Sequence, residues 1–138
     1  MPPTTILIRH ADVTPGSGSD PPLNAAGVAR AQKLRHVLGD ARISAIFVSQ
    51  FQRTQRTGEP LAADLGLVPT VVGDVATAVA AIRTLPSAAV VLVVGHTTTL
   101  PDISARLGGP PIPAIDLTDF DHLFVHTRGR LTHLRYGP

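Results

Sequence analysis

The run Ala-Val-Val-Leu-Val-Val at residues 89–94 constrains the fold more than any other stretch of the chain. A short, uninterrupted apolar run rich in β-branched residues is typical of a strand that is buried on both faces, as in the middle of a parallel sheet. A second run of this kind, Ile6 to Ile8, lies near the amino end. Expected strands alternate with expected helices through most of the chain, which predicts an α/β fold.

Helix signals separate these strands. Asn24 offers an N-cap to a helix that runs to about Leu38. Its inward face would carry Val28, Ala31, Leu34, Val37 and Leu38. A helix that begins near residue 51 contains Pro60, which predicts a kink or a break near Gly58.

The remaining segments complete the pattern. We expect strands at 43–48 and 68–72, helices at 76–85 and 100–107, and a C-terminal hairpin made of 121–127 and 131–136. The predicted fold is a three-layer α/β/α sandwich with a mostly parallel central sheet and an antiparallel C-terminal edge hairpin. Residues 1–138 would form one domain.

Composition excludes several classes of function. The chain has no cysteine, which excludes disulfides and thiolate chemistry. Its 12 Lys and Arg residues are spread without a dense run or interleaved aromatic residues, which argues against a nucleic-acid partner. No apolar stretch approaches the roughly 20 residues of a membrane span. We see no export signal and expect a cytoplasmic protein.

Three predicted strands end in side chains that suit phosphoryl chemistry. Arg9 and His10 follow the first strand, Ser49 and Arg53 follow the second, and His96 follows the fourth. Because the carboxyl ends of parallel strands share one edge, two histidines and two arginines are expected to converge there. Guanidinium forks match phosphoryl oxygens, and a neutral imidazole can act as a nucleophile.

In these motifs the chain resembles the histidine phosphatase superfamily, also called phosphoglycerate mutase-like. The family's Arg-His-Gly motif corresponds to Arg9-His10-Ala11 in this chain, and its Gly-His motif corresponds to Gly95-His96. The family's Ser-x-x-x-Arg-x-x-x-Thr motif corresponds to Ser49, Arg53 and Thr57. Its leucine-polar-x-x-Gly motif corresponds to Leu23, Asn24 and Gly27. The four motifs occur in the family's order over nearly the whole chain. The short phosphohistidine phosphatases of bacteria are the branch that it resembles.

The resemblance implies a role for each residue. His10 would be the nucleophile and form a phosphohistidine that water hydrolyses. Arg9 and Arg53 would clamp the phosphoryl oxygens. His96 would stabilise the transition state by hydrogen bonding, and could hold a positive charge. The backbone N–H of Thr97, at a helix start, would add an anion-binding donor. No metal or cofactor is required.

The proton donor is less clear from the sequence. Larger relatives use a glutamate after the third strand, but the only Glu here is Glu59, inside the second helix. Asp74 lies in about the corresponding place and is the candidate acid, with the N-cap of a helix as its alternative role. Asp12 is the second candidate and would contact the substrate.

Three further histidines lie on the C-terminal hairpin: His122, His126 and His133. His122 and His126 would face the same side of a strand, but no carboxylate cluster with the spacing of metal ligands accompanies them. We interpret all three as edge-strand histidines and expect no metal site.

The stretch between Arg53 and His96 is too short to add a cap domain over the site. An open, shallow site favours a phosphohistidine on a protein or a range of small phosphomonoesters as substrates. It disfavours a phosphoglycerate mutase, which must hold its intermediate away from water. A phospho-ligand-binding module without turnover is the alternative from another class.

Overall fold

The computed structural model describes residues 2–137 and contains one six-stranded sheet with the strand order β3-β2-β4-β1-β5-β6. The strands are β1 Thr4–Arg9, β2 Ala45–Val48, β3 Thr70–Val71, β4 Val90–Gly95, β5 His122–Thr127 and β6 Arg130–Arg135. Strands β1 to β4 pair in parallel, whereas β5 pairs antiparallel with β1 and β6 antiparallel with β5. The mostly parallel sheet with an antiparallel C-terminal hairpin is confirmed.

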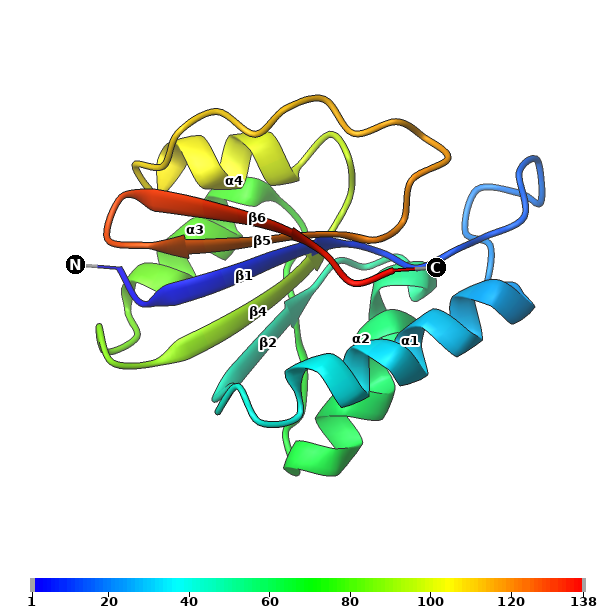
Figure 1. Ribbon diagram of the computed structural model, residues 1–138, viewed down its shortest axis with the longest axis horizontal. Helices are drawn as coiled ribbons and strands as arrows, with labels where there is room; N and C mark the ends of the chain where they lie inside the picture. Colours follow the sequence, from blue (N-terminus) through cyan, green and yellow to red (C-terminus); the bar gives the residue numbers. More distant parts are fainter. Residues whose placement is uncertain (1, 138) are drawn as a thin grey trace.

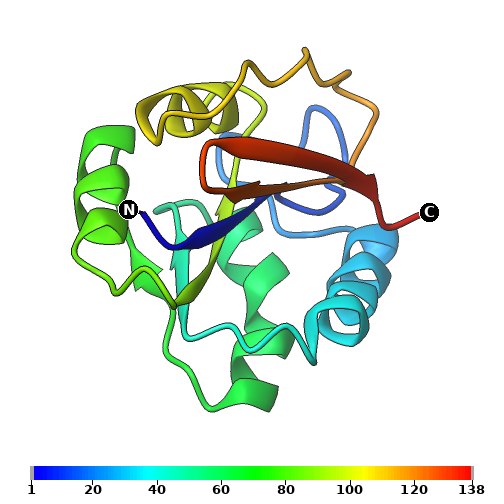
Figure 2. The same cartoon turned by 60° about the vertical axis from the view of Figure 1, so that its left-hand side comes forward.

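Helices cover both faces of this sheet (Figures 1 and 2). They are α1 Ala25–Leu38, α2 Gln52–Leu65, α3 Val75–Arg83 and α4 Leu100–Arg106. Apolar side chains of α1 and α2 form one core with one face of the sheet, and those of α3 and α4 form a second core with the other face. The predicted three-layer arrangement is therefore confirmed. Within residues 2–137, no helix is long and apolar enough to cross a membrane.

The two central strands are buried on both faces, as their apolar runs predict. Ile6 and Ile8 pack in the core under α1 and α2, and Leu7 packs in the core under α3 and α4. Successive side chains of a strand point to opposite faces, so an unbroken apolar run serves both cores. This burial fixes where β1 and β4 end, and with it the position of the polar residues that follow them.

The inward face of α1 is narrower than predicted. Its buried residues are Gly27, Ala31, Leu34 and Leu38, whereas Val28 and Val37 are 53% and 45% exposed. The two valines flank the buried stripe of α1. Their assignment to the core was wrong.

Pro60 does not break the second helix. Helix α2 is continuous from Gln52 to Leu65. Pro60 lacks the N–H that would bond to the carbonyl of Arg56, and the helix continues without this one hydrogen bond. The third strand is also shorter than expected: only Thr70–Val71 pairs with β2, and Val68 is 89% exposed.

The start of α1 explains the glycine in the Leu-Asn-x-x-Gly motif. Asn24 Oδ1 accepts a hydrogen bond from the Gly27 N–H at 2.9 Å, and the Asn24 N–H donates to the Asp12 carbonyl at 3.0 Å. A Cβ atom on Gly27 would overlap the Asp12 carbonyl oxygen. Glycine therefore allows the helix to start directly against the segment that follows β1.

We predict that Gly27→Ala destabilises the protein. Overpacking against a backbone carbonyl costs about 1–3 kcal/mol, only partly offset by the better helix propensity of Ala. The melting temperature should fall by about 5 °C. Gly73→Ala is the matched control for calorimetry, because a Cβ there meets nothing within 4 Å. An unchanged melting temperature in Gly27→Ala would contradict the close approach.

Candidate active site

The predicted residues of three strand ends meet at one edge of the sheet. Arg9 pairs with Gly95 at the ends of β1 and β4, so His10 and His96 directly follow paired positions. The His10 N–H continues the ladder by donating to the Gly95 carbonyl at 2.9 Å. The two imidazole ring centroids lie 5.4 Å apart.

The ring of His10 is held in one tautomer. Its Nδ1 lies 2.8 Å from the carbonyl oxygen of Ala11. A carbonyl oxygen can only accept a hydrogen bond, so Nδ1 carries the proton and Nε2 keeps its lone pair. The residue is only 5% exposed. The arrangement fixes the imidazole with its basic nitrogen available for attack on an electrophile.

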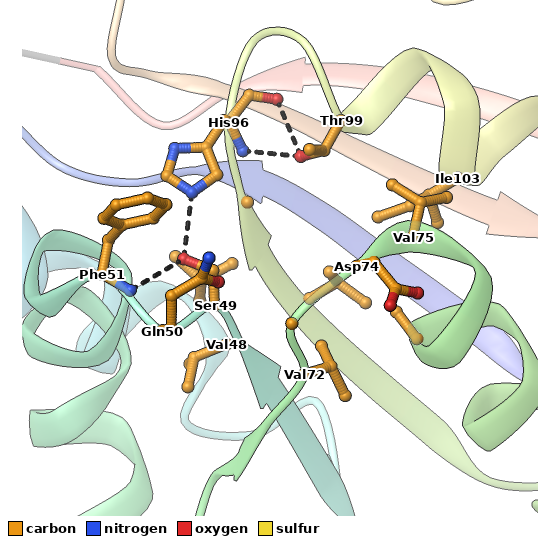
Figure 3. A pocket seen from close by; sticks show the side chains of 15 residues that line it. Val48, Ser49, Gln50, Phe51, Val72, Asp74, Val75, His96, Thr99 and Ile103 are labelled. Atoms are coloured by element: carbon orange, nitrogen blue, oxygen red, sulfur yellow. Dashed lines mark hydrogen bonds between the residues drawn. The ribbon is translucent and has the colours of Figure 1, made fainter.

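His96 is fixed from the neighbouring strand end. Its Nε2 lies 3.0 Å from Ser49 Oγ (Figure 3). Ser49 Oγ in turn lies 2.8 Å from Thr54 Oγ1. The backbone N–H of His96 donates to Thr99 Oγ1 at 3.0 Å. Ser49 was recognised as part of a motif, but its contact with His96 joins β2 to β4 and only the tertiary structure reveals it.

Both histidines are neutral in the free protein at neutral pH. Burial lowers the pKa of His10 from 6.5 to about 4, and the nearby charges of Arg9 and Arg53 also lower it. Burial, followed by Arg53 and Arg9, lowers the pKa of His96 from 6.5 to about 4. The expected positive charge on His96 is therefore absent in the free protein. A neutral His10 suits a nucleophile, because a protonated imidazole has no lone pair to donate.

We predict that the His10 and His96 rings stay neutral at pH 5.5, where an unperturbed histidine is about nine-tenths protonated. The measurement is an NMR pH titration of the imidazole protons in phosphate-free buffer, with His10→Gln and His96→Gln for assignment. Since the unfolded chain takes up these protons near pH 6.5 and the folded chain does not, stability should fall as the pH drops from about 6.5 towards 4. Titration of either ring near 6.5 would contradict its burial.

Arg9 is anchored by a loop from the far end of the chain. Its Nη1 donates to the carbonyls of Leu117 and Asp119 at 2.9 and 2.8 Å, and its Cζ lies 4.0 Å from the centroid of the Phe120 ring. The Nε atom is buried and has no hydrogen-bond partner in the described part of the chain. The contribution of residues 117–120 was missed by the sequence analysis, because this irregular segment carries no local signal.

Arg53 reaches the site from the first turn of α2. Its Cζ lies 4.5 Å from the centroid of the Phe51 ring, and Nη1 lies 3.5 Å from the Ser19 carbonyl. Within residues 2–137, no carboxylate forms an ion pair with either Arg9 or Arg53. Two guanidinium charges without direct counter-ions make this edge strongly attractive to anions.

Thr57 couples the two arginine-bearing segments. Its hydroxyl accepts a hydrogen bond from the Ala11 N–H at 2.8 Å and donates to the Arg53 carbonyl at 2.7 Å. Thr57 is fully buried. The spacing from Ser49 to Thr57 thus has a structural reason: Ser49 contacts His96, Arg53 enters the site, and Thr57 ties α2 to the backbone after His10.

An open pocket with a volume of about 350 Å³ lies beside His10. Its lining residues are His10, Phe51, Arg53, His96, Thr97, Thr98 and Thr99. Thr97 lies in the turn that precedes α4, which begins only at Leu100. Phe51 was missed as a site residue, since an aromatic residue beside a helix start is as typical of a core.

Asp74 is the N-cap of α3. One of its carboxylate oxygens accepts a hydrogen bond from the Thr77 N–H at 2.7 Å, and this bond lowers the pKa of Asp74. The residue is exposed, and its carboxylate is turned towards α3 and away from His96 (Figure 3). Asp74 lines a second pocket that also contains His96, but not the pocket that contains His10.

Asp12 is paired with a cation. Its Oδ1 lies 2.6 Å from Arg30 Nε and its Oδ2 lies 3.4 Å from Arg30 Nη2. Asp12 is not among the residues that line the pocket around His10. The structure therefore brings together His10, His96 and Arg53 with Arg9 beside them, while neither predicted aspartate joins them.

The hairpin histidines form no metal cluster. His122 Nδ1 lies 2.7 Å from His133 Nε2, whereas His126 is fully buried and neither of its ring nitrogens has a hydrogen-bond partner among residues 2–137. Because β5 lies between β1 and β6, the edge-strand interpretation holds for His133 and was wrong for His122 and His126. No group of three or more potential ligand side chains in the described part of the chain could hold a metal ion.

A phosphoryl group is the chemistry that these features suit. The neutral imidazole of His10 lies beside that of His96, and two arginines supply positive charge at the carboxyl edge of a mostly parallel sheet. Positioned cations and hydrogen-bond donors of this kind stabilise the negative charge of a phosphoryl group that is being transferred.

Comparison with protein families also indicates phosphoryl chemistry. Residues 5–75 match the model of the histidine phosphatase superfamily, branch 1. The chain belongs to this superfamily and is an enzyme that hydrolyses phosphoryl groups. A search of curated protein sequences gave no significant match.

Solved structures show the same fold. The protein histidine phosphatase SixA, complexed with tungstate, is 23% identical, with a TM-score of 0.72 over 96% of this chain and 97% of that chain. A mycobacterial glucosyl-3-phosphoglycerate phosphatase in complex with VO3 is 15% identical, with a TM-score of 0.72 over 96% of this chain and 98% of that chain.

Proposed function

We propose that the protein, with residues 1–138 acting as one domain, is a metal-independent phosphatase that works through a phosphohistidine on His10. The observation that carries the proposal is the neutral His10 ring, whose Nδ1 is committed to the Ala11 carbonyl and whose Nε2 is left basic. Arg9 and Arg53, which have no carboxylate ion pair within residues 2–137, supply the charge that a phosphoryl dianion needs.

The reaction has two steps on one nitrogen. His10 Nε2 attacks phosphorus, a P–N bond forms, and the bond to the leaving group breaks with its electron pair. Water then attacks phosphorus, the P–N bond breaks, and phosphate leaves with Nε2 restored. Arg9, Arg53 and the Thr97 backbone N–H would hold the equatorial oxygens, and His96 would donate a hydrogen bond to the charge that develops.

The contact between Ser49 and His96 supports that role. If Ser49 Oγ donates to His96 Nε2, the proton of His96 resides on Nδ1 and is free to be donated to a phosphoryl oxygen. A neutral donor of this kind stabilises developing negative charge without a permanent charge of its own. The fully buried Thr54 hydroxyl holds Ser49 in place.

The observations weigh against both candidate proton donors. Asp74 caps α3 with a lowered pKa, and Asp12 is paired with Arg30, whereas a general acid must stay protonated until it is used. Leaving groups of low pKa need the least help from an acid. The imidazole of a protein phosphohistidine and an aryl oxide are leaving groups of this kind.

Two substrate classes suit such a site: phosphohistidine on a protein and small phosphomonoesters. The first class agrees with the name of the SixA neighbour, and the second with that of the glucosyl-3-phosphoglycerate phosphatase. The open pocket beside His10 leaves room for either. We propose cytoplasmic action on such substrates.

The test is hydrolysis of p-nitrophenyl phosphate in the presence of excess chelator. We expect turnover that the chelator does not change. Binding of phosphate or vanadate without turnover would instead favour a phospho-ligand-binding module, and a requirement for a bisphosphorylated primer would favour a phosphoglycerate mutase. Loss of turnover with chelator, restored by added metal, would contradict the metal-independent mechanism.

A further inference from the structure

A second pocket lies beside the phosphoryl site, between the ends of β2 and β4 and the first turn of α3 (Figure 3). Its volume is about 120 Å³. The apolar part of its wall consists of Val48, Val72, Val75, Ala78, Val93 and Ile103. Several of these side chains belong to or pack against the core under α3 and α4, so the core opens to the surface here.

The two pockets share one wall. Phe51, His96 and Thr99 line both the second pocket and the pocket that contains His10 and Arg53. A substrate whose phosphoryl group is held by His10 and Arg53 can therefore extend past the His96 ring into the second pocket over a short distance. The shared lining residues make the position suitable for a group that lies close to the phosphoryl group.

The size and lining of the second pocket select the kind of group it can hold. A dry, apolar cavity of about 150 Å³ accepts benzene, and this pocket, at about 120 Å³, is slightly smaller and open at one side. Asp74 and Gln50 belong to its lining as well, but the Asp74 carboxylate is turned towards α3. Because apolar side chains form much of the wall, a neutral apolar group is favoured.

We propose that this second pocket is a subsite for a neutral, ring-sized apolar group that the substrate carries next to its phosphoryl group. The inference rests on the proposed phosphatase function and narrows its substrates: among phosphomonoesters, those of aromatic or branched apolar alcohols bind best. Burial of such a group in an apolar pocket should strengthen binding about tenfold or more.

The test compares two non-hydrolysable phosphonates. Methylphosphonate occupies only the phosphoryl pocket, whereas benzylphosphonate adds a ring that is one carbon away from phosphorus. The ratio of the affinities for the two phosphonates is measured in two ways: from inhibition constants against p-nitrophenyl phosphate and from dissociation constants obtained by calorimetry. We expect benzylphosphonate to bind about tenfold more tightly to the wild type.

Variants that fill the second pocket localise the effect. Ala78→Leu adds bulk at a buried position of the pocket wall, and Val75→Phe fills the pocket from a partly exposed position if Ala78→Leu fails to fold. Each should abolish the advantage of benzylphosphonate and leave methylphosphonate binding within about twofold. Ala80→Leu, on the exposed side of α3, makes the same chemical change outside the pocket and should keep the ratio.

The outcomes separate this inference from the proposed function. Calorimetry measures both phosphonates even in a protein without turnover, so absent hydrolysis alone counts against the phosphatase and not against the subsite. Equal affinities for the two phosphonates would overturn the subsite, and so would an advantage of benzylphosphonate that survives in Ala78→Leu or Val75→Phe.

Discussion

His10→Ala is expected to lower the turnover number for p-nitrophenyl phosphate by at least about 10⁴-fold, because removal of a nucleophile removes the covalent pathway altogether. The ring that is lost is the one whose Nδ1 is held by the Ala11 carbonyl and whose Nε2 is kept unprotonated by burial. Steady-state kinetics at pH 6 to 8 measure the loss. Rapid quenching with labelled substrate should trap a phosphoenzyme in the wild type and none in the variant.

The matched control is His36→Ala, which removes an exposed histidine of α1 far from the pocket. It should leave both the turnover and the trapped intermediate unchanged. A His10→Ala protein that folds, as judged by its melting temperature, and keeps more than about a hundredth of the wild-type turnover would contradict the nucleophile assignment.

Arg53→Ala is expected to lower kcat/KM by about 10²–10³-fold, the usual loss when one preorganised donor to a developing charge is removed. Arg53 has no carboxylate ion pair within residues 2–137, so its charge is directed mainly at whatever anion enters the pocket. Arg53→Lys should recover only part of the loss, because an ammonium keeps the charge but lacks the planar fork. The inhibition constant of inorganic phosphate should rise from the wild type to Arg53→Lys and again from Arg53→Lys to Arg53→Ala.

Arg56→Ala controls for the loss of an arginine on the same helix. Arg56 is exposed and lies 3.3 Å from Glu59, and it does not line the pocket around His10. Its removal should change kcat/KM by less than about twofold, because exposed ion pairs contribute little. Equal effects of Arg53→Ala and Arg56→Ala would mean that Arg53 acts only through the general charge of the protein.

Most of the fold could be predicted because its signals are local. The apolar runs at β1 and β4 require burial on both faces, and the Asn24 cap defines the start of α1. The predictions were wrong where the burial or continuity of a helix depends on the packing around it. Val28 is exposed although its helical spacing predicts burial, and α2 continues through Pro60 although proline favours a break.

The candidate site was likewise predicted only in part. Membership of His10, Arg53 and His96 followed from their positions after parallel strands, whose carboxyl ends necessarily share an edge. The roles of the carboxylates did not follow. Asp12 contacts Arg30, which lies 18 positions further on, and Asp74 caps a helix whose direction relative to His10 is set by packing.

By itself the sequence determined that a mostly parallel sheet forms and that two histidines and two arginines gather at its carboxyl edge, because strand burial and strand direction are encoded in short runs. Only the tertiary structure decided the chemical state of those groups. The tautomer of His10, the contact of Ser49 with His96 and the anchoring of Arg9 by residues 117–119 all depend on burial and hydrogen bonds. The last two join segments that are 47 and 108 or more positions apart, a separation that no local pattern encodes.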